Sequence, residues 1–443
     1  MTLVMKFGGS SIADAACMRQ AASLVREALP RAPLVVLSAM GKTTDALFRA
    51  ARAAGAGRES EALRELGDIA DRHRATAAEL CGGEVPAELA AALERSFAEL
   101  ERIVQGVGLL RELSPRSIDA IAARGELLST TLFASELAAR GVPTVWFDAR
   151  EALRTDANFG CAQPRVEALR VLARERLAPD LAPGCAVVTQ GYIGSTEDGA
   201  TTTLGRGGSD YSAALFAAAL GADEVQIWTD VEGVCSADPR RVPNAQPIAE
   251  LSFAEAAELA AFGAKVLHPA TIQPAVEARI PVTVRHTQRP HGRFTTIRER
   301  SLGGRPFVAL ASRGPVAVLT VTSTRMLDAS GFLARLFEVF GRLGVSVDLV
   351  ATAEVSVSLT VEQDAPLAAL KRELEAFARV EIADDRAIIA LVGERLRQTP
   401  GVPARALRAL EDLHIEMLSM GANEINLSFV VARSLETEAV RRL

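Results

Sequence analysis

Short apolar runs alternate with stretches of helical periodicity through roughly the first two thirds of the chain. The runs that predict buried strands are 3–7, 34–38, 144–148, 185–191, 224–229 and 281–285. The clearest predicted helices are 46–53, 116–140, 213–220, 253–262 and 269–278, with two more expected within 58–110. Strands that alternate with helices form a largely parallel sheet covered by helices on both faces. We therefore predict an α/β fold for this part of the chain.

The C-terminal part of the chain follows a different pattern, because it repeats itself. Gly331 matches Gly401, and Glu354-Val355 matches Glu424-Ile425 at the same offset. Each copy has the order strand, helix, strand, strand, helix, and the first copy has one more strand near 380–385. The second copy lacks a last strand, which the apolar run 307–312 can supply. We therefore predict two nested βαββαβ units, a ferredoxin-like arrangement that by itself fixes no function.

These patterns predict the domain boundaries. The predicted segments are a main domain over 1–292, a linker over 293–306, a first small unit over 313–385, and a second small unit made of 307–312 with 386–443. A chain of 443 residues is too long for a single core, which agrees with several domains.

Composition narrows the class of protein. The net charge is −6 without a long basic block, so nucleic acid is not an expected partner. No uncharged apolar run reaches about 18 residues, and the first residues lack a signal-peptide pattern, so neither a membrane span nor export is expected. The five cysteines are scattered and lack metal-ligand spacing, which predicts no metal centre and favours reduced thiols in the cytoplasm.

The first candidate for chemistry is the glycine turn after the first apolar run. Lys6 ends that run, and Gly8-Gly9-Ser10-Ser11 separates it from a helical pattern that starts near Asp14. Glycines allow close backbone approach, and helix N-termini attract anions, so this turn suits a phosphate. A plain strand–turn–helix connection explains the pattern equally well. Only four of the 49 basic residues are lysines, which favours a chemical role for Lys6.

The densest polar motif is Thr201–Ser212, which precedes the predicted helix 213–220. Its glycines can expose amide groups at the helix start, Arg206 can grip a carboxylate or phosphate, and Asp210 can orient a cation. The alternative is an ordinary capped helix after a loop. Glu126 lies between glycine and apolar residues, where it either faces inward or is a surface glutamate. Asp348 and Glu354 either hold an amino group or are exposed turn residues.

With these motifs, the chain resembles the aspartate kinases of the monofunctional, lysine-sensitive type. The resemblance runs nearly end to end, and its most specific stretches are 6–11, 201–212, 228–231 and 262–269. It implies an amino-acid kinase fold followed by two ACT units. It also implies phosphorylation of the L-aspartate side chain by ATP to give 4-phospho-L-aspartate, the first step toward lysine, threonine and methionine. Mg²⁺ held mainly by the nucleotide phosphates, inhibition by L-lysine, and a homodimer or homotetramer through the ACT units are further implications.

The resemblance also assigns residues. The implied catalytic residues are Lys6, Asp210 and Lys265. The implied aspartate-binding residues are Ser38, Thr44, Glu126 for the ammonium group and Arg206 for the α-carboxylate. The implied ATP-binding residues are Gly8, Gly9, Ser10, Thr229, Asp230, Cys235, Arg240, Lys265 and Val266. The implied effector-binding residues are Met326, Gly331, Phe332, Leu333, Ser346, Val347, Asp348 and Glu354.

Three positions depart from the family pattern. Cys235 stands where relatives often carry tyrosine, which removes a ring contact to ATP. Ala329 and Ala353 stand where lysine-sensing relatives commonly have serines, and each lost hydroxyl weakens a bound amino acid by roughly 1 kcal/mol. Two other functions remain open: a kinase for another small acid such as N-acetylglutamate, and an amino-acid sensor without catalysis. Glu126 and Arg206 favour a free amino acid, and the presence of Lys6 and Asp210 favours catalysis.

Overall fold

The computed structural model consists of two compact units. It describes residues 2–264, 267, 269–301, 306–324, 330–421 and 424–443. The first unit comprises Met1–Val234 with Leu267–Glu299, and the second comprises Cys235–Val266 with Arg300–Leu443. The domain boundaries predicted at 292 and 306 divide the chain by sequence pattern, whereas these units are defined by packing. The predicted boundaries therefore remain a prediction.

The first unit is built on a mainly parallel sheet, as predicted. Within this unit the strand order is β3-β4-β2-β1-β7-β9-β10. The bounds are β1 Leu3–Phe7, β2 Pro33–Leu37, β3 Thr144–Phe147, β4 Ala186–Gln190, β7 Glu224–Thr229, β9 Val282–His286 and β10 Thr295–Arg298. Only β10 runs antiparallel to its neighbour β9. The six predicted strands are confirmed to within one residue at either end.

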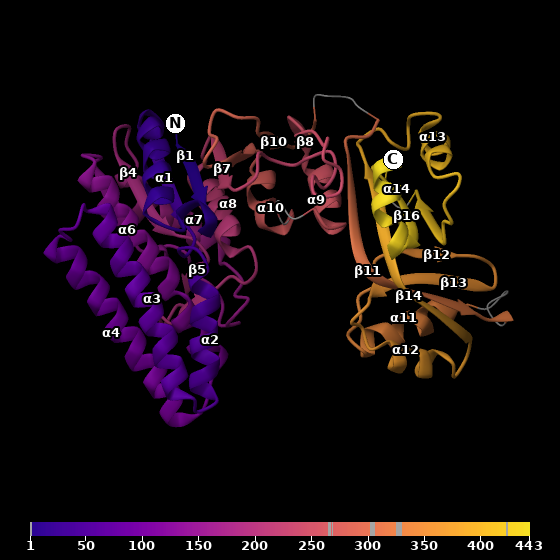
Figure 1. Cartoon of the computed structure of the whole chain (residues 1–443), viewed down its shortest axis with the longest axis horizontal. Coiled ribbons are helices and arrows are strands. Elements are labelled where there is room, and N and C mark those ends of the chain that lie inside the picture. Colours follow the sequence, from indigo (N-terminus) through magenta and orange to yellow (C-terminus); the bar gives the residue numbers. More distant parts are fainter. Residues whose placement is uncertain (1, 265–266, 268, 302–305, 325–329, 422–423) are drawn as a thin grey trace. The chain divides into compact units, whose positions relative to one another are not determined.

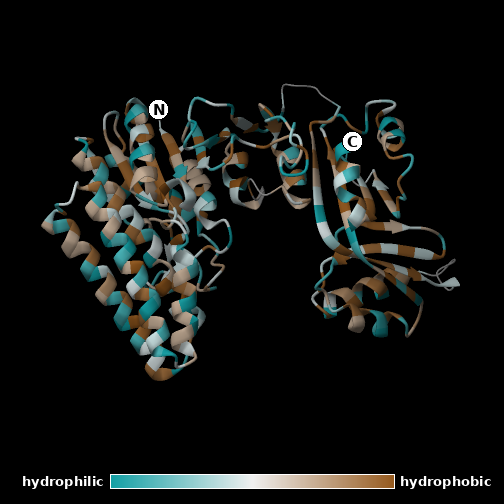
Figure 2. Cartoon of the chain, viewed as in Figure 1, coloured by the Kyte–Doolittle hydropathy of each residue, from teal (hydrophilic) through white to brown (hydrophobic). Residues whose placement is uncertain are grey.

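Helices cover both faces of this sheet (Figure 1). The residues of β1 and β2 that face one side pack into a core with α1 Ala15–Ala28 and α6 Arg124–Ala139. The long helices α2 Thr43–Gly55, α3 Glu59–Leu80 and α4 Ala87–Leu110 extend that core. The opposite face carries α8 Gly208–Leu220, with α7 Val166–Leu172 and α10 Pro269–Glu277 packed against it. Figure 2 shows the corresponding apolar strands inside and mixed hydropathy along α3 and α4.

The single helix predicted over 116–140 is wrong, because this stretch forms two helices. α5 spans Pro115–Ala122, and α6 begins at Arg124. Gly125 packs so tightly that an added Cβ would lie 2.7 Å from the Cβ of Ala39. The break therefore sets the first turn of α6 directly against the loop that follows β2.

The second unit is built on an antiparallel sheet of order β12-β13-β11-β14-β16-β15. The bounds are β11 Ala309–Thr322, β12 Val350–Thr352, β13 Ser356–Glu362, β14 Arg379–Val392, β15 Met417–Met420 and β16 Asn426–Ala432. Its helices are α11 Phe332–Arg342, α12 Leu367–Leu374, α13 Val402–Ala409 and α14 Glu436–Arg442.

The strand β11 serves both sequence repeats. Its first part, Ala309–Arg313, pairs with Ile388–Val392 of the second repeat. Its last part, Val316–Thr322, pairs with β13 of the first repeat. The predicted strand near 380–385 is likewise the first half of the longer β14. The outer strands β12 and β13 belong to the first repeat, and β15 and β16 belong to the second. The two repeats share the long central strands β11 and β14.

The segment Cys235–Val266 packs within this second unit. It contains β8 Glu250–Ser252 and α9 Phe253–Ala261, whose start is closed by a capping box between Ser252 and Glu255. The other carboxylate oxygen of Glu255 accepts a hydrogen bond from the Glu394 amide at 3.0 Å. The side-chain amide of Asn426 donates to Glu258 at 2.8 Å. A part of the chain that the sequence places in the main domain is thus held by the repeat sheet.

Candidate active site

A cavity of about 610 Å³ opens where β1, β2 and β4 of the first unit end. Seven of the residues assigned from the sequence line it: Lys6, Gly9, Ser38, Thr44, Glu126, Arg206 and Asp210. They come from segments far apart in the chain, as expected for a site at the carboxyl ends of parallel strands. The candidate catalytic and aspartate-binding residues in the described chain therefore share one cavity.

The glycine turn after β1 contributes Gly9 to the lining of this cavity. A Cβ on Gly9 would lie 2.8 Å from the carbonyl oxygen of Gly41 and 2.9 Å from that of Ala39. The amide of Gly8 donates to the carbonyl of Trp228 at 3.1 Å, so that amide is engaged in holding the turn. The turn continues as a 3₁₀ helix, Gly9–Ile12, and α1 begins only at Ala15. The predicted helix start near Asp14 is confirmed, since Asp14 is its N-cap.

Lys6 and Asp210 form an ion pair inside the cavity. The distance from Lys6 Nζ to Asp210 Oδ1 is 2.7 Å, and the two side chains are only 10% and 17% exposed. Lys6 reaches the cavity from the end of β1, and Asp210 from the first turn of α8. The pair fixes an ammonium group at the cavity wall, where an incoming anion can meet it.

The start of α8 faces the same space. Gly205 and Gly207 have φ of 77° and 72°, which side chains other than glycine rarely adopt. Gly191, at the end of β4, has room for no side chain, because its Cβ would lie 2.6 Å from the Cβ of Ser209. The helix start therefore approaches the strand ends closely and presents amide groups and a positive dipole end to the cavity.

Glu126 faces inward, which resolves the alternative left open by the sequence. It is 3% exposed, and its Oε1 accepts a hydrogen bond from the Ala39 amide at 3.1 Å. Its Oε2 has no hydrogen-bond partner among the described residues. Burial raises the pKa of Glu126 to about 8, and the Ala39 amide and the Lys6 charge offset this only in part. A buried carboxyl oxygen without a partner suits a cationic ligand.

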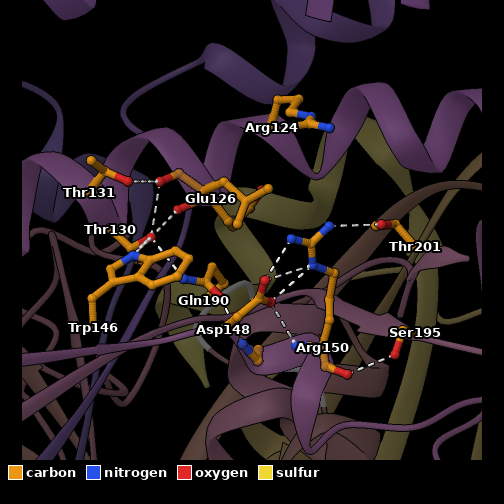
Figure 3. Close-up of polar contacts among 12 residues, drawn as sticks. Arg124, Glu126, Thr130, Thr131, Trp146, Asp148, Arg150, Gln190, Ser195 and Thr201 are labelled. Atoms are coloured by element: carbon orange, nitrogen blue, oxygen red, sulfur yellow. Dashed lines mark hydrogen bonds and ion pairs between the residues drawn. The ribbon is translucent and has the colours of Figure 1, made fainter. Parts of the chain in front are cut away.

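A hydrogen-bond network holds α6 in this position (Figure 3). The hydroxyl of Thr130 accepts hydrogen bonds from Trp146 on β3 at 3.1 Å and from Gln190 on β4 at 3.0 Å. The same hydroxyl donates to the backbone carbonyl of Glu126 at 2.8 Å. Arg150 follows β3, where it pairs with Asp148 and donates to Thr201 at 3.1 Å. These contacts join α6 to the strands on which the cavity is built.

The remaining aspartate-binding candidates also lie at the cavity. The hydroxyl of Ser129 donates to the carbonyl of Ser38 at 2.7 Å, which ties the end of β2 to α6. Thr44 is in the first turn of α2. Arg206 is exposed and makes no ion pair with another described residue. Its guanidinium is thus available to an anion.

The candidate ATP-binding residues are spread over both units. Thr229 ends β7 and its hydroxyl donates to Asp230 at 3.1 Å. Cys235 and Arg240 belong to the second unit, where Arg240 pairs with Asp238 at 2.8 Å. Ser10 is exposed in the turn after β1. Lys265 and Val266 lie outside the described residues. A nucleotide site formed by these residues stays a prediction.

The candidate effector residues lie in the first repeat. Gly331 starts α11 with φ 90°, and the side chains of Leu333, Ser346 and Glu354 are exposed. Phe332 and Val347 are partly buried and pack against the core of that repeat. Met326 and Ala329 lie outside the described residues. These assignments, too, stay predictions.

Asp348 is the most informative of these residues. Its Oδ1 pairs with Arg313 at 3.0 Å, and its buried Oδ2 has no partner among the described residues. Burial raises the pKa of Asp348 more than Arg313 lowers it. The alternative of an exposed turn residue is therefore wrong for Asp348, whereas it describes Glu354.

The sequence pattern missed two residues of the cavity region. Tyr192 follows β4 and lines the cavity. Asp119 on α5 is 1% exposed and accepts hydrogen bonds from the amides of Gly160 and Thr203. One available signal was that Tyr192 is one of only two tyrosines in the chain.

Within the described part of the chain, no helix has the length and apolar character needed to cross a bilayer. The same residues contain no group of three or more His, Cys, Asp or Glu side chains arranged to hold a metal ion.

Comparisons with known proteins identify relatives along the whole chain. Residues 1–286 match the model of the amino acid kinase family, and residues 389–443 match an ACT domain model. Lysine-sensitive aspartokinase 3 of Escherichia coli (strain K12) is 41% identical over 455 residues, which cover 100% of this chain and 98% of that protein.

Two solved structures of an E. coli enzyme are similar in fold. Aspartokinase III in complex with aspartate and ADP (R-state) has a TM-score of 0.84 and 40% identity, and covers 100% of this chain and 99% of that chain. The complex with lysine and aspartate (T-state) has a TM-score of 0.83 and 40% identity, with 100% and 98% covered.

Proposed function

Because the chain belongs to the aspartokinases within the amino acid kinase family, we propose that it transfers the γ-phosphoryl group of ATP to the side-chain carboxylate of L-aspartate. The cavity of the first unit is the proposed site. The observation that carries the proposal is the presence there of a buried, unpartnered carboxyl oxygen on Glu126 in the same cavity as the cationic groups Lys6 and Arg206. This arrangement suits a small molecule that carries an ammonium and carboxylates.

The proposed roles follow from charge. Glu126 holds the substrate ammonium, and the binding of that cation favours the ionised form of Glu126. Arg206 binds the α-carboxylate, with Ser38 and Thr44 lining the pocket. The side-chain carboxylate of aspartate is already ionised at pH 7, so its attack on phosphorus needs no general base.

Lys6 and the start of α8 serve the transferred group. Phosphoryl transfer depends on positioning and on cations that neutralise the charge of the transition state. Asp210 orients Lys6, because its Oδ1 lies 2.7 Å from Lys6 Nζ. From this position the ammonium group can move toward a phosphate oxygen. Amide groups at the α8 start supply further positive potential.

The expected Mg²⁺ fits this site through the nucleotide. Mg²⁺ in kinases is commonly held by substrate phosphates, waters and one or two carboxylates, and it neutralises charge on the phosphates. Among the acidic lining residues, Asp210 is already paired with Lys6. This donor set agrees with a metal held mainly by ATP.

L-Lysine is the proposed effector, bound in the first repeat around Asp348.

Exposed apolar side chains lie on the edge strands of the repeat sheet, Val350 on β12 and Leu418 and Met420 on β15. They support a homo-oligomer formed through this sheet. The five cysteines are free, which is typical of proteins in a reducing compartment. A cytoplasmic location remains a prediction.

One assay tests the catalytic proposal. ATP consumption is measured with L-aspartate, the acyl phosphate is trapped with hydroxylamine, and N-acetyl-L-glutamate is the competing substrate. We expect hydroxamate formation with aspartate only. Turnover of N-acetylglutamate without turnover of aspartate would establish the other small-acid kinase, and no turnover of either would establish a sensor. Adding millimolar L-lysine should lower the rate, and an unchanged rate would contradict the regulatory proposal.

A further inference from the structure

Asp119 on α5 joins two segments beside the cavity that are far apart in the sequence. Its Oδ2 accepts hydrogen bonds from the amide of Gly160 at 2.9 Å and from the amide of Thr203 at 2.8 Å. Its Oδ1 accepts a hydrogen bond from the hydroxyl of Thr203 at 2.8 Å. Asp119 is only 1% exposed, so these three contacts are shielded from water.

The first of the two segments is the loop 155–164. Its two ends pair with each other, and Gly160 lies near its middle. Gly160 has a φ of 86°, a conformation that favours glycine, and it lines the cavity. The hydrogen bond to Asp119 therefore holds this loop at a point where it borders the cavity.

The second segment is the end of β6, Thr201–Thr203, which pairs with β5, Ile193–Ser195. Thr203 makes hydrogen bonds with its amide, its hydroxyl and its carbonyl. The amide and the hydroxyl donate to Asp119, and the carbonyl accepts from the Ala162 amide at 2.9 Å. Thr203 is therefore a firmly held residue.

The turn that carries Arg206 begins directly after this point. The Gly208 amide donates to the Gly205 carbonyl at 3.0 Å, which closes the turn around Arg206. A Cβ on Gly205 would lie 3.2 Å from the carbonyl oxygen of Gly160, so the turn packs closely against the loop. Both neighbours of the turn, Thr203 before it and Gly160 beside it, are thus held by one carboxylate.

Asp119 serves these segments as an acceptor. Three hydrogens point at its two oxygens, and an ionised carboxylate can accept all of them. Burial raises the pKa of Asp119, and the hydrogen bonds from Gly160 and Thr203 offset this in part. A buried carboxylate is costly unless hydrogen bonds compensate for the lost water, and here the two segments supply them.

We propose that Asp119 is a positioning residue of the aspartate site, which holds the Arg206 turn where its guanidinium meets the α-carboxylate of the substrate. Asp119 is not among the described residues that line the cavity, so it acts through Arg206. The inference rests on the proposed function, and it adds what places the anion-binding side chain.

The first test removes the acceptor and then restores it. Asp119→Ala should raise the KM for L-aspartate about 10-fold, with kcat and the KM for ATP within about threefold of the wild type, because a displaced group binds its ligand less well. Asp119→Asn keeps an oxygen for the two amides, and its NH₂ group can donate to the Thr203 hydroxyl oxygen. Its KM should therefore lie within about threefold of the wild type.

Two outcomes of this test would overturn the proposal. An unchanged KM in Asp119→Ala means that the turn is placed without Asp119. Equal impairment in Asp119→Asn and Asp119→Ala means that the negative charge matters and the placement of the two segments does not.

Glu136→Ala is the matched control for a loss of stability. Glu136 is also a buried carboxylate, 5% exposed, and it pairs with Arg140 away from the cavity lining. Both alanine variants should unfold at a lower urea concentration than the wild type, but only Asp119→Ala should change the KM for aspartate. An equally raised KM in Glu136→Ala would show that general loosening is sufficient, and the proposal would fail.

Thr203→Val is a milder variant that decides the question if Asp119→Ala does not fold. It removes one of the three hydrogen bonds and keeps both amide contacts. The KM for aspartate should rise about threefold, and an unchanged KM would contradict the proposal.

The link to Arg206 is tested by a double-mutant cycle on kcat/KM for L-aspartate. Arg206→Ala alone should lose about 10–100-fold, because hydrogen bonds between charged groups are lost. In that background, Asp119→Ala should lose less than about threefold more, since both substitutions remove the same contact with substrate. Losses that multiply would show that Asp119 acts independently of Arg206.

Failure of this inference differs from failure of the proposed function. A wild-type protein that does not phosphorylate aspartate contradicts the proposed function before any variant is made. A wild type that turns over aspartate, together with an Asp119→Ala variant of equal KM, contradicts only the role of Asp119.

Discussion

At the scale of single residues, burial sets the chemistry of the cavity. Glu126 and Lys6 are almost fully enclosed, but within the described part of the chain only Lys6 has an ion-pair partner, Asp210. One carboxyl oxygen of Glu126 has no hydrogen-bond partner among the described residues, and Lys6 pairs with the carboxylate of Asp210, which lines the cavity. Both groups therefore remain available to a ligand, and each leads to a prediction.

Aspartate binding should depend on pH through Glu126. Its pKa is raised to about 8 by burial, so the free enzyme carries it mostly neutral below that pH. The ionised form binds the ammonium, and the KM for aspartate should therefore fall as pH rises from 6 to 8, by at most 10-fold per unit, and then level off. Measuring KM for both substrates from pH 6 to 9 checks this, with the KM for ATP as the control. Glu126→Gln should raise the KM for aspartate and remove its pH dependence.

Lys6 should act on the transition state more than on binding. Lys6→Ala is expected to lower kcat on the order of 10²–10³-fold while changing the KM for aspartate only a few-fold. The matched control is Lys371→Ala on α12, an exposed lysine with a 3.8 Å contact to Glu375, which should leave both constants unchanged. Normal turnover in Lys6→Ala would remove this residue from the catalytic role.

At the scale of elements, the turn after β1 requires glycine for a steric reason. Gly9→Ala would place a methyl group within 3 Å of two backbone oxygens, so we expect the protein to lose about 1–3 kcal/mol of stability and most of its activity. Gly67→Ala is the matched control, because Gly67 lies in α3 with nothing within 4 Å of its added Cβ. That substitution should stabilise the helix by up to about 1 kcal/mol. Urea unfolding of both variants gives the comparison.

The strand β11 leads to a prediction about regulation. It carries Arg313, which occupies Asp348 at 3.0 Å and also pairs with Glu362. Arg313 therefore competes with a cationic effector for the negative charge of Asp348. Arg313→Gln should therefore lower the lysine concentration that gives half-inhibition several-fold. Arg379→Gln, an exposed pair with Glu381 on β14, is the control. Weaker inhibition in Arg313→Gln would mean that Arg313 supports the effector site instead.

The sequence predicted elements well and their long-range packing less well. Apolar runs and glycine turns are local signals, and they predicted the strands, the helix N-terminus at Asp14, and Lys6 and Asp210 as candidate residues. The helix predicted over 213–220 begins five residues earlier, at Gly208. The role of Asp119 could not be seen, because its position on a short helix resembles that of a surface acid. The two helices within 116–140 were missed because the break falls at Ala123, a residue type that favours helix and gives no local signal of an interruption.

At the scale of the molecule, the segment around α9 belongs energetically to the repeat sheet. Glu255 and Glu258 bind the Glu394 amide and Asn426, and Arg241 pairs with Glu436. Ligand binding stabilises the unit that it binds, and amide exchange slows throughout a cooperative unit. Lysine should therefore slow hydrogen exchange in 253–261 together with β11 and β14. Exchange slowed in the sheet but not in 253–261 would show that α9 moves independently.

The packing of 235–266 also bears on how such a chain can be recombined. Consider a hybrid of two related genes made by a single crossover near residue 300. Its repeat sheet would come from one parent and its segment 235–266 from the other. The two sides of the Arg241–Glu436 ion pair and of the Glu258–Asn426 hydrogen bond would then come from different parents. A viable hybrid needs a second exchanged piece from the middle of the gene. Regulation in this architecture is therefore inherited as two linked segments and not as a detachable tail.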